Sequence, residues 1–417
     1  MRVPFGRVLV CVTLALAVAA CGGDDGGSST PAADTANEQD VSSELDSSAS
    51  DGASVDAGAT DAIGDTTAPV TDVSLDVGEF GGVTKPTTII EIDGLWRIGS
   101  SAEVHLTSTR FGKVEVVHYD NDTNRAYTTA PVGVSGPGGV VRQGVYSVYQ
   151  WTEPKGGLAY LCQVDTNLNT EKAALQSTKS GKTDQLDTGC NGGPWIKLER
   201  PELSGVWASS FGGNEVVTAL EMGSINIIEW DNESNTLYTQ NPDGIGPSSL
   251  LFNRVVWTEF AAGPAWYCKL DVGMKSLADA KASTKTADDN DPDNSGCNGF
   301  GWTKLSPLAV RGTYAVTGGA LGHITSHWWN KRLLAGFDNA GRVAWLRNHP
   351  EAETFPNRYA RVVWTEVESG GHFWACVTDD GLSDLSDAQE SEKSPDATDP
   401  GASGCNGGPW TRFTKVQ

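Results

Sequence analysis

The stretch NRVVWTEFAAGPAWYCKLD, residues Asn253–Asp271, decides the fold that we expect for this chain. It predicts two strands joined by a short Gly-Pro turn, because apolar and polar residues alternate on both sides of the turn. The pair recurs as YSVYQWTEPKGGLAYLCQVD (Tyr146–Asp165) and as YARVVWTEVESGGHFWACVTD (Tyr359–Asp379). Each copy is followed by an alanine-rich segment, an Asp-rich loop and the signature Cys-Asn-Gly-x-x-Trp. The chain therefore contains three copies of one module.

The spacing of the copies indicates a whole domain per copy. The signature tryptophans Trp195, Trp302 and Trp410 lie 107 and 108 residues apart, which is too long for a solenoid repeat. We place the modules at residues 87–200, 201–307 and 308–417. The expected strands of module two are Ser204–Ser209, Glu215–Met222, Ile225–Asp231, Thr236–Gln240, Phe252–Phe260, Ala265–Asp271 and Gly301–Leu305.

A capping box at Ser276 predicts one short helix in module two, and Thr170 and Asp384 hold the matching position in the other modules. The fold class that follows is all-β. We expect three tandem antiparallel modules, each with six or seven strands and one short helix. The pattern leaves open whether each module is a small barrel or a sandwich.

The N-terminus has the features of an export signal. Arg2 and Arg7 precede the apolar run Val8–Ala20, which is shorter than the ~20 residues that span a bilayer. The end of this run and the two residues after it, Val18-Ala19-Ala20-Cys21-Gly22, resemble the lipobox of bacterial lipoproteins. The resemblance implies a signal peptide over residues 1–21 and a Cys21 that carries acyl chains such as palmitate. It also implies that the protein is anchored to a membrane and faces the periplasm or the cell surface. The residue after the cysteine, Gly22, favours the outer membrane over the inner one. The alternative is an ordinary cleaved secretory signal.

Residues 22–86 are rich in Asp, Ser, Ala, Thr and Gly, and have too few apolar residues to form a core. We expect a disordered acidic linker that holds the modules away from the membrane. The whole chain carries a net charge of −23. Such a charge disfavours nucleic acid as a partner, because phosphate backbones would be repelled.

Six cysteines fall two to a module, separated by 28, 29 and 29 residues. A structural zinc site needs four ligands, which no module supplies. We therefore predict one disulfide in each module, consistent with export to an oxidising compartment. The predicted pairs are Cys162–Cys190, Cys268–Cys297 and Cys376–Cys405.

Two groups of residues are candidates for ligand sites. Trp328, Trp329 and Trp345 occur in module three without counterparts in the aligned sequence, and could stack on a glycan or a peptide; the alternative is local repacking of the core. Asp289, Asp291 and Asp293 are spaced as in calcium loops, with a hydrated turn as the alternative. Calcium is the one cofactor that we consider.

The repeated Trp-Thr-Glu glutamates, Glu153, Glu259 and Glu366, could act as acids or bases. We favour a structural role, because catalysis would need three complete sites. The function that we expect is binding or surface interaction with a glycan or a protein. The alternatives are a carbohydrate-active hydrolase of the envelope and a structural envelope protein without a ligand. The oligomeric state is left open.

Each module begins with Gly-x-aromatic and ends with an aromatic residue followed by a cation. The arrangement resembles the lipocalin superfamily, which implies a first-strand aromatic residue packed under the last-strand cation of a closed barrel. Module three departs from the pattern, because it has Tyr314 in place of the first-strand tryptophan. It also lacks the glutamate that Glu103 supplies in module one and Glu215 in module two, two residues that we take as equivalent. The expected pairs are Trp96 with Lys197, Trp207 with Lys304, and Tyr314 with Arg412.

Overall fold

The computed structural model describes residues 88–100, 102–130, 144–259, 264–350, 352 and 354–416. The predicted lipidation site Cys21 and the predicted linker 22–86 lie outside these residues. Within the described ranges, no helix is long and apolar enough to cross a membrane.

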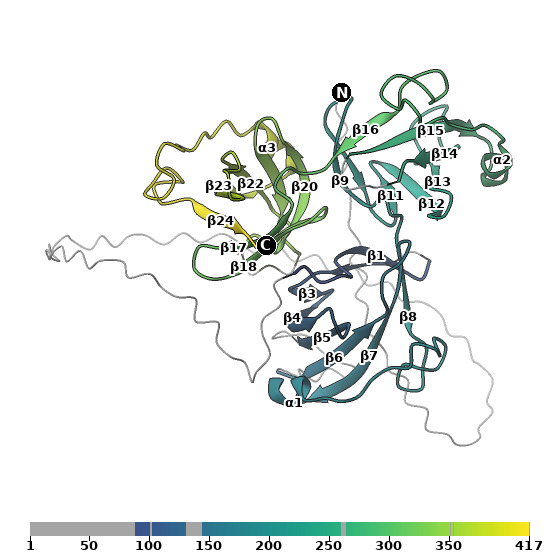
Figure 1. The fold of residues 1–417 in the computed structure, drawn as a ribbon. Helices are drawn as coiled ribbons and strands as arrows, with labels where there is room; N and C mark the ends of the chain where they lie inside the picture. Colours follow the sequence, from purple (N-terminus) through teal and green to yellow (C-terminus); the bar gives the residue numbers. More distant parts are fainter. Residues whose placement is uncertain are drawn as a thin grey trace, which may run out of the picture. The chain divides into compact units, whose positions relative to one another are not determined.

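The described chain forms three closed barrels of eight antiparallel strands each (Figure 1). The all-β prediction is confirmed, and each module is a barrel and not a sandwich. Barrel 1 comprises β1 (Gly94–Ile98), β2 (Ala102–Leu106), β3 (Arg110–Phe111), β4 (Val114–Asp120), β5 (Arg125–Thr129), β6 (Tyr146–Trp151), β7 (Leu158–Leu168) and β8 (Ile196–Glu199). Barrel 2 comprises β9 (Gly205–Ser209), β10 (Asn214–Val217), β11 (Glu221–Met222), β12 (Ile225–Asp231), β13 (Thr236–Gln240), β14 (Phe252–Trp257), β15 (Ala265–Met274) and β16 (Thr303–Ser306). Barrel 3 comprises β17 (Gly312–Val316), β18 (Leu321–Ile324), β19 (Trp328–Trp329), β20 (Arg332–Asp338), β21 (Val343–Arg347), β22 (Tyr359–Trp364), β23 (His372–Leu382) and β24 (Thr411–Lys415).

Strands that follow one another in sequence are paired, and the last strand of each barrel pairs back with the first. The eighth strand comes from a segment that we expected to be continuous. The predicted strand Glu215–Met222 is two strands, β10 and β11, because Thr218 forms a turn between them. The Thr218 hydroxyl accepts the backbone N–H groups of Leu220 and Glu221, both at 3.0 Å. A side chain that bonds nearby backbone in this way favours a turn over an extended strand.

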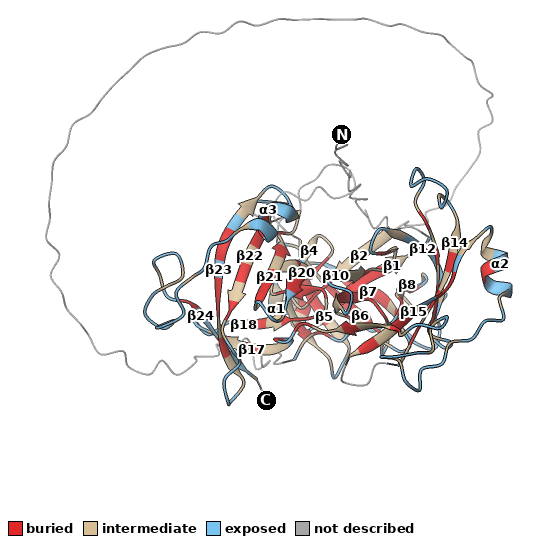
Figure 2. Cartoon of the chain, turned by 90° about the horizontal axis from the view of Figure 1, so that it is seen from above, coloured by how far each residue is buried: buried red, intermediate tan, exposed pale blue. Residues whose placement is uncertain are grey.

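Each barrel carries one short helix after its seventh strand: α1 (Glu171–Leu175), α2 (Leu277–Ala282) and α3 (Leu385–Glu390). The predicted caps are confirmed. The side chains of Thr170, Ser276 and Asp384 each accept the backbone N–H three residues later, at 3.1, 3.1 and 2.9 Å. Figure 2 shows buried residues along the strands and exposed ones on α2 and α3.

One asparagine in each barrel holds the segment that leads into that barrel. Asn232, in the β12–β13 turn, accepts the N–H of Glu202 at 3.0 Å and donates to the carbonyl of Arg200 at 3.0 Å. Asn121 and Asn339 make the same pair of bonds to the segments before β1 and β17. The segments between barrels are therefore fixed by hydrogen bonds and not loose.

The cation over the first-strand aromatic residue is not the one that we predicted. Arg200, just after β8, lies 4.2 Å from the ring centre of Trp96, and Arg311 lies 5.9 Å from that of Trp207. Lys304 and Arg412 instead lie over aromatic residues of the seventh strands, Trp266 and Trp374. The reason is alternation: a last-strand cation directly after the inward-facing position points outward, away from the barrel interior. Lys197 accordingly pairs with Glu199 at 2.7 Å.

The change from Trp to Tyr314 preserves a bond. Trp96 and Trp207 donate from their indole nitrogens to the carbonyls of Ile92 and Leu203, at 2.8 and 3.0 Å. The Tyr314 hydroxyl donates to the equivalent carbonyl of Val310 at 3.0 Å. The departure of module three from the Gly-x-Trp pattern therefore leaves the barrel closed in the same way.

Candidate functional site

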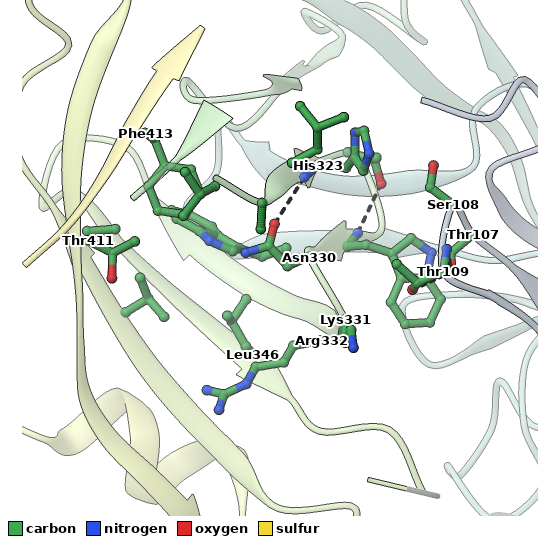
Figure 3. A pocket seen from close by; sticks show the side chains of 18 of the residues that line it. Thr107, Ser108, Thr109, His323, Asn330, Lys331, Arg332, Leu346, Thr411 and Phe413 are labelled. Carbon is green, nitrogen blue, oxygen red and sulfur yellow. Dashed lines mark hydrogen bonds between the residues drawn. The ribbon is translucent and has the colours of Figure 1, made fainter. Parts of the chain in front are cut away.

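Barrel 3 contains a cavity of about 440 Å³, a size typical of small-molecule sites. Each of the eight strands of barrel 3 contributes residues to the lining, so the cavity lies in the interior of the barrel. Figure 3 shows side chains that line it. The wall is mainly apolar, and several of its residues belong to the core of the barrel. These core residues are Val316, Trp329, Leu346, Val362, Ala375 and Phe413.

Two small residues leave this space open. By strand register, Ala375 of β23 and Gly322 of β18 stand where barrel 2 has Tyr267 and Glu215. In barrel 2, the Tyr267 hydroxyl donates to Glu215 Oε2 at 3.1 Å. Burial and the charge of Glu215 raise the pKa of Tyr267 to about 12, so the phenol is neutral. A buried ring and its carboxylate partner therefore fill in barrel 2 the space that barrel 3 leaves open.

The same registers correct the alignment of the glutamates. Glu215 is equivalent to Val104 of barrel 1, and Glu103 is equivalent to Asn214. Glu103 has a different task, since its Oε1 accepts the N–H of Ala219 at 3.0 Å. The glutamate that module three lacks is thus the one that binds the filling tyrosine in barrel 2.

Barrel 1 is filled by a different residue. Tyr149 stands where barrel 3 has Val362, and its ring packs edge-on against Phe111 with ring centres 5.6 Å apart. Leu161 occupies the position of Ala375. Burial raises the pKa of Tyr149 to about 12, so this phenol is neutral as well. Barrels 1 and 2 therefore fill this part of their interiors with different residues.

Barrel 2 also has a polar interior where barrel 3 is apolar. Asn253 Nδ2 donates to Thr239 at 3.3 Å and to Asn241 at 2.9 Å. Barrel 3 has Ala360 and Leu346 at the positions of Asn253 and Thr239. The cavity of barrel 3 is thus continuous with an apolar core.

The structure does not bring the three predicted tryptophans together as one exposed patch. Trp329 is 4 % exposed and packs inside barrel 3 against Trp364 and Phe413. Trp328 is 3 % exposed and lies edge-on to His105 of barrel 1, with ring centres 5.3 Å apart. Trp345 is equivalent to Tyr127 and Tyr238, and faces away from the core residues beside it on β21. Trp328 and Trp329 line the cavity, whereas Trp345 does not.

A cation and an amide distinguish the rim of the cavity. Arg332 of β20 stands where barrels 1 and 2 have Val114 and Ile225. Its Nη2 pairs with Asp380 at 2.5 Å, while its buried Nη1 donates no hydrogen bond within the described part of the chain. Asn330 has the positive φ of 56° that glycine adopts at the same turn in the other barrels, and its Oδ1 accepts the N–H of His323.

Residues of barrel 1 also border the cavity, among them Asp93 and Ser108. Burial raises the pKa of Asp93 to about 7, against the opposing effects of a Thr325 hydrogen bond and the Arg200 charge. The pKa of His105 is lowered to about 4 by burial and by the charge of Arg347, so this ring is neutral at pH 7.

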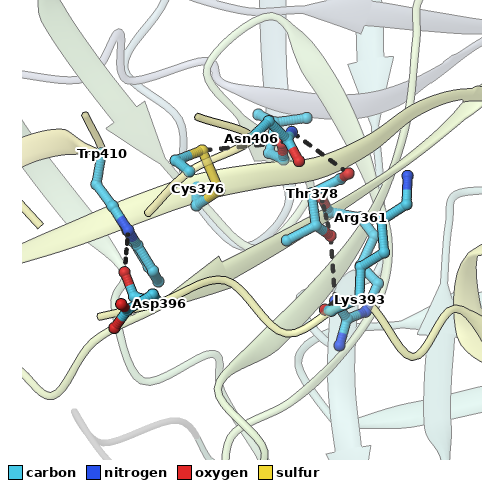
Figure 4. The surroundings of a disulfide bond; sticks show 9 residues. Arg361, Cys376, Thr378, Lys393, Asp396, Asn406 and Trp410 are labelled. Atoms are coloured by element: carbon cyan, nitrogen blue, oxygen red, sulfur yellow. Dashed lines mark hydrogen bonds between the residues drawn. A yellow bond between two sulfur atoms is a disulfide. The ribbon is translucent and has the colours of Figure 1, made fainter. Parts of the chain in front are cut away.

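The Cys-Asn-Gly-x-x-Trp signature is structural. All three predicted disulfides are formed, Cys162–Cys190, Cys268–Cys297 and Cys376–Cys405. In barrel 3, Asn406 donates to the carbonyl of Val377 at 2.8 Å, and Trp410 donates to that of Asp396 at 3.0 Å (Figure 4). The glycine before the second cysteine, Gly404, has no room for a Cβ, which would lie 1.9 Å from the same Asp396 oxygen.

The predicted calcium loop gains no support from the described residues. Asp293 Oδ1 accepts the indole N–H of Trp266 at 3.1 Å, and Asp291 Oδ1 accepts from Asn294 at 2.9 Å. Across the described ranges, no group of three or more His, Cys, Asp or Glu side chains could hold a metal ion. Calcium at Asp289, Asp291 and Asp293 stays a prediction.

Sequence reasoning missed a buried aspartate in the seventh strand of each barrel. Asp165, Asp271 and Asp379 each pair with a lysine fourteen residues later, at 2.7, 3.2 and 2.6 Å. Burial alone would raise the pKa values of Asp165 and Asp379, but bonds from the lysines and from nearby serines lower them. The constant Asp-to-Lys spacing was the signal that could have found these pairs, which fix the loop after the helix.

The Trp-Thr-Glu glutamates do not gather at the cavity. Glu366 pairs with Arg342 at 2.8 Å, and neither residue lines it. Asp93 is the one carboxylate among the described residues that line the cavity. Glycoside hydrolysis uses a pair of carboxylates.

No family model, curated protein or solved structure matches this chain. The candidate function therefore depends on the geometry of the three barrels and on the differences among them.

Proposed function

We propose that this protein is a lipid-anchored binding protein of the cell envelope that takes a small apolar molecule into barrel 3. The observation that supports the proposal is the cavity of about 440 Å³ that residues of all eight strands line. Burying apolar ligand surface there yields ~25 cal/mol per Å². The rings of Trp329 and Phe413 and the side chains of Leu346 and Val362 are the wall that such a molecule would contact.

Barrels 1 and 2 serve in this proposal as a filled scaffold. Tyr149 and Tyr267 occupy the interior positions that would otherwise admit a ligand. The ligand class differs from the glycan or protein that we expected from the sequence. Stacking on a sugar needs exposed aromatic faces, whereas Trp328 and Trp329 are buried.

The binding proposal is tested with N-phenyl-1-naphthylamine, an apolar dye whose fluorescence rises on leaving water. The full chain would carry Cys21→Ser, which blocks lipidation. This protein, the parent chain of the binding tests, then needs no detergent, and no detergent competes with the dye for the cavity. Ala375→Leu introduces the residue that barrel 1 has at this position, and we expect it to lower dye affinity at least about tenfold by occupying the cavity.

The matched control is Ala340→Leu, which makes the same change in the exposed β20–β21 turn. We expect dye affinity to be unaltered there. Equal dye binding by Ala375→Leu and the parent chain would refute barrel 3 as the site.

The anchor is a separate part of the proposal. It is supported by the ordered leader that ends at Cys21. Detergent phase partitioning of the unmodified sequence and of Cys21→Ala should place the former in the detergent phase and the variant in water, because two or more acyl chains on Cys21 hold a protein in a membrane. If the unmodified sequence were found wholly in water, the anchor would be overturned and the binding proposal would stand.

A further inference from the structure

We infer that the molecule bound by barrel 3 is an amphipathic acid, whose carboxylate binds Arg332 while its apolar part lies against Leu346, Val362 and Phe413. The inference rests on the proposed function, because it names the ligand of the same cavity. It starts from the contrast between the apolar wall of the cavity and the cation Arg332 at its rim.

The position of Arg332 is the first observation. In a barrel that follows the pattern of the others, this position holds an aliphatic residue, Val114 or Ile225. Figure 3 shows the side chain of Arg332 beside Leu346 on the wall of the cavity. A guanidinium carries its charge at all relevant pH values, and removing it from water is costly unless an acceptor is provided.

The hydrogen bonds of Arg332 are the second observation. Asp380 Oδ2 accepts from Nη2 at 2.5 Å, whereas Nη1 is buried and donates no bond within the described residues. The other Asp380 oxygen is already used, since Oδ1 accepts from Gly381 N–H at 2.9 Å and from Asn348 at 3.3 Å. A small rotation of the guanidinium would turn Nη1 toward the cavity, where a ligand oxygen would give it the missing acceptor.

The charges around the cavity are the third observation. Lys331 and Arg332 line it, and because Asp380 balances the charge of Arg332, Lys331 adds a further positive charge at the cavity. Among the described residues that line the cavity, Asp93 is the one carboxylate, and burial raises its pKa to about 7, so only part of the molecules carry this charge at neutral pH. The cavity therefore favours an anionic group over a cationic one.

The apolar wall sets the rest of the ligand. Leu346, Val362 and Phe413 present no hydrogen-bonding groups, so the buried part of the ligand is hydrocarbon. A carboxylate fits the planar guanidinium and is the acid group to which we commit.

The experiment is displacement of bound N-phenyl-1-naphthylamine by decanoate or by decan-1-ol, on the full chain with Cys21→Ser at about pH 6, where the acid is ionised and Asp93 is mainly neutral. The two competitors share one hydrocarbon chain and differ in the head group. We expect decanoate to displace the dye at about tenfold lower concentration than the alcohol, since a charge-assisted bond is stronger than a neutral one. In Arg332→Gln, this preference should vanish while displacement by the alcohol is retained.

Arg342→Gln is the matched control, because Arg342 also pairs with a carboxylate, Glu366 at 2.8 Å, but does not line the cavity. It should keep the preference for decanoate. Arg332→Lys, which retains the charge without the planar fork, should show an intermediate preference and replaces Arg332→Gln if that variant fails to fold. Equal displacement by acid and alcohol in the parent chain, or a preference that survives the loss of Arg332, would overturn the inference with the binding proposal intact. A parent chain that does not bind the dye at all would overturn both.

Discussion

Barrels 2 and 3 share one scaffold and differ in what fills it. Both have eight strands, a disulfide across 29 residues, a capped helix and an asparagine that holds the segment leading into the barrel. Inside, barrel 2 places Tyr267 against Glu215, whereas barrel 3 has Ala375 and Gly322. One scaffold can therefore enclose a cavity or a filled interior, depending on the side chains at two interior positions.

The sharpest way to break the comparison is to empty barrel 2. Tyr267→Ala removes a ring that is 6 % exposed and leaves Glu215 without its hydroxyl partner. We expect the free energy of unfolding to fall by ~3–5 kcal/mol, the range for deletion of a buried aromatic ring. Urea unfolding followed by circular dichroism measures it.

Tyr238→Ala is the control for Tyr267→Ala, because Tyr238 lies on the same barrel but outside the core cluster. Its cost should be clearly smaller. If the two variants lose equal stability, Tyr267 is not the filling residue.

The shared scaffold is tested by removing one disulfide from each barrel. Cys268→Ser/Cys297→Ser and Cys376→Ser/Cys405→Ser open loops of equal sequence separation, 29 residues. The chain-entropy model then gives about 3–4 kcal/mol for each. Calorimetry of the two variants should show similar losses, and a loss in one barrel alone would contradict the view that the two barrels share one scaffold.

Barrel 3 also differs from barrel 2 on its outside, where Trp328 replaces Glu221 and contacts His105. The folded-state pKa of His105 is about 4, lowered by burial and by Arg347, whereas the unfolded chain titrates near 6.5. The unfolded state therefore binds more protons in this window, and stability should fall as pH falls from about 6.5 to about 4. The size is on the order of 3 kcal/mol for His105.

Three charged or titratable groups interact with His105 at this contact, namely Arg347, His327 and His349, and Arg110 acts on His349. Burial also lowers the pKa of His349 to about 4, so it contributes in the same direction. Unfolding midpoints measured across this pH window should fall less steeply in His105→Phe than in the parent chain. Identical slopes would remove His105 from the explanation.

The smallest effect concerns the first strand. Tyr314→Phe removes only the hydroxyl that donates to Val310 at 3.0 Å. We expect a loss of ~1 kcal/mol, typical of one hydrogen bond. An unchanged unfolding midpoint would show that Tyr314 does not replace the indole bond of Trp207.

Much of the fold could be predicted because the sequence pattern of the module occurs three times. The repeats fixed the disulfide pairs, the caps and most strands, since alternation and capping act over a few residues. The eighth strand was missed because Glu215–Met222 alternates through a turn that Thr218 imposes. The cation over the ring was misplaced because Arg200 lies beyond the last strand.

The site could not be predicted in the same way. Ala375 and Gly322 lie far apart in the sequence. That they leave a cavity becomes clear only when the strand registers show that they are equivalent to Tyr267 and Glu215, which fill barrel 2. Sequence reasoning looked for added aromatic residues, whereas the cavity lies where barrel 3 has small residues, Ala375 and Gly322. Arg332 could have been found as a charge at an aliphatic position, but only after the barrels had been aligned strand by strand.

The most direct test of the central claim is a crystal of the protein pressurised with xenon, which enters apolar cavities. The account predicts a xenon site in barrel 3 among Leu346, Val362 and Phe413, and no site within the interior of barrel 2 around Tyr267. A barrel 3 without xenon, or xenon bound equally inside barrels 2 and 3, would contradict it.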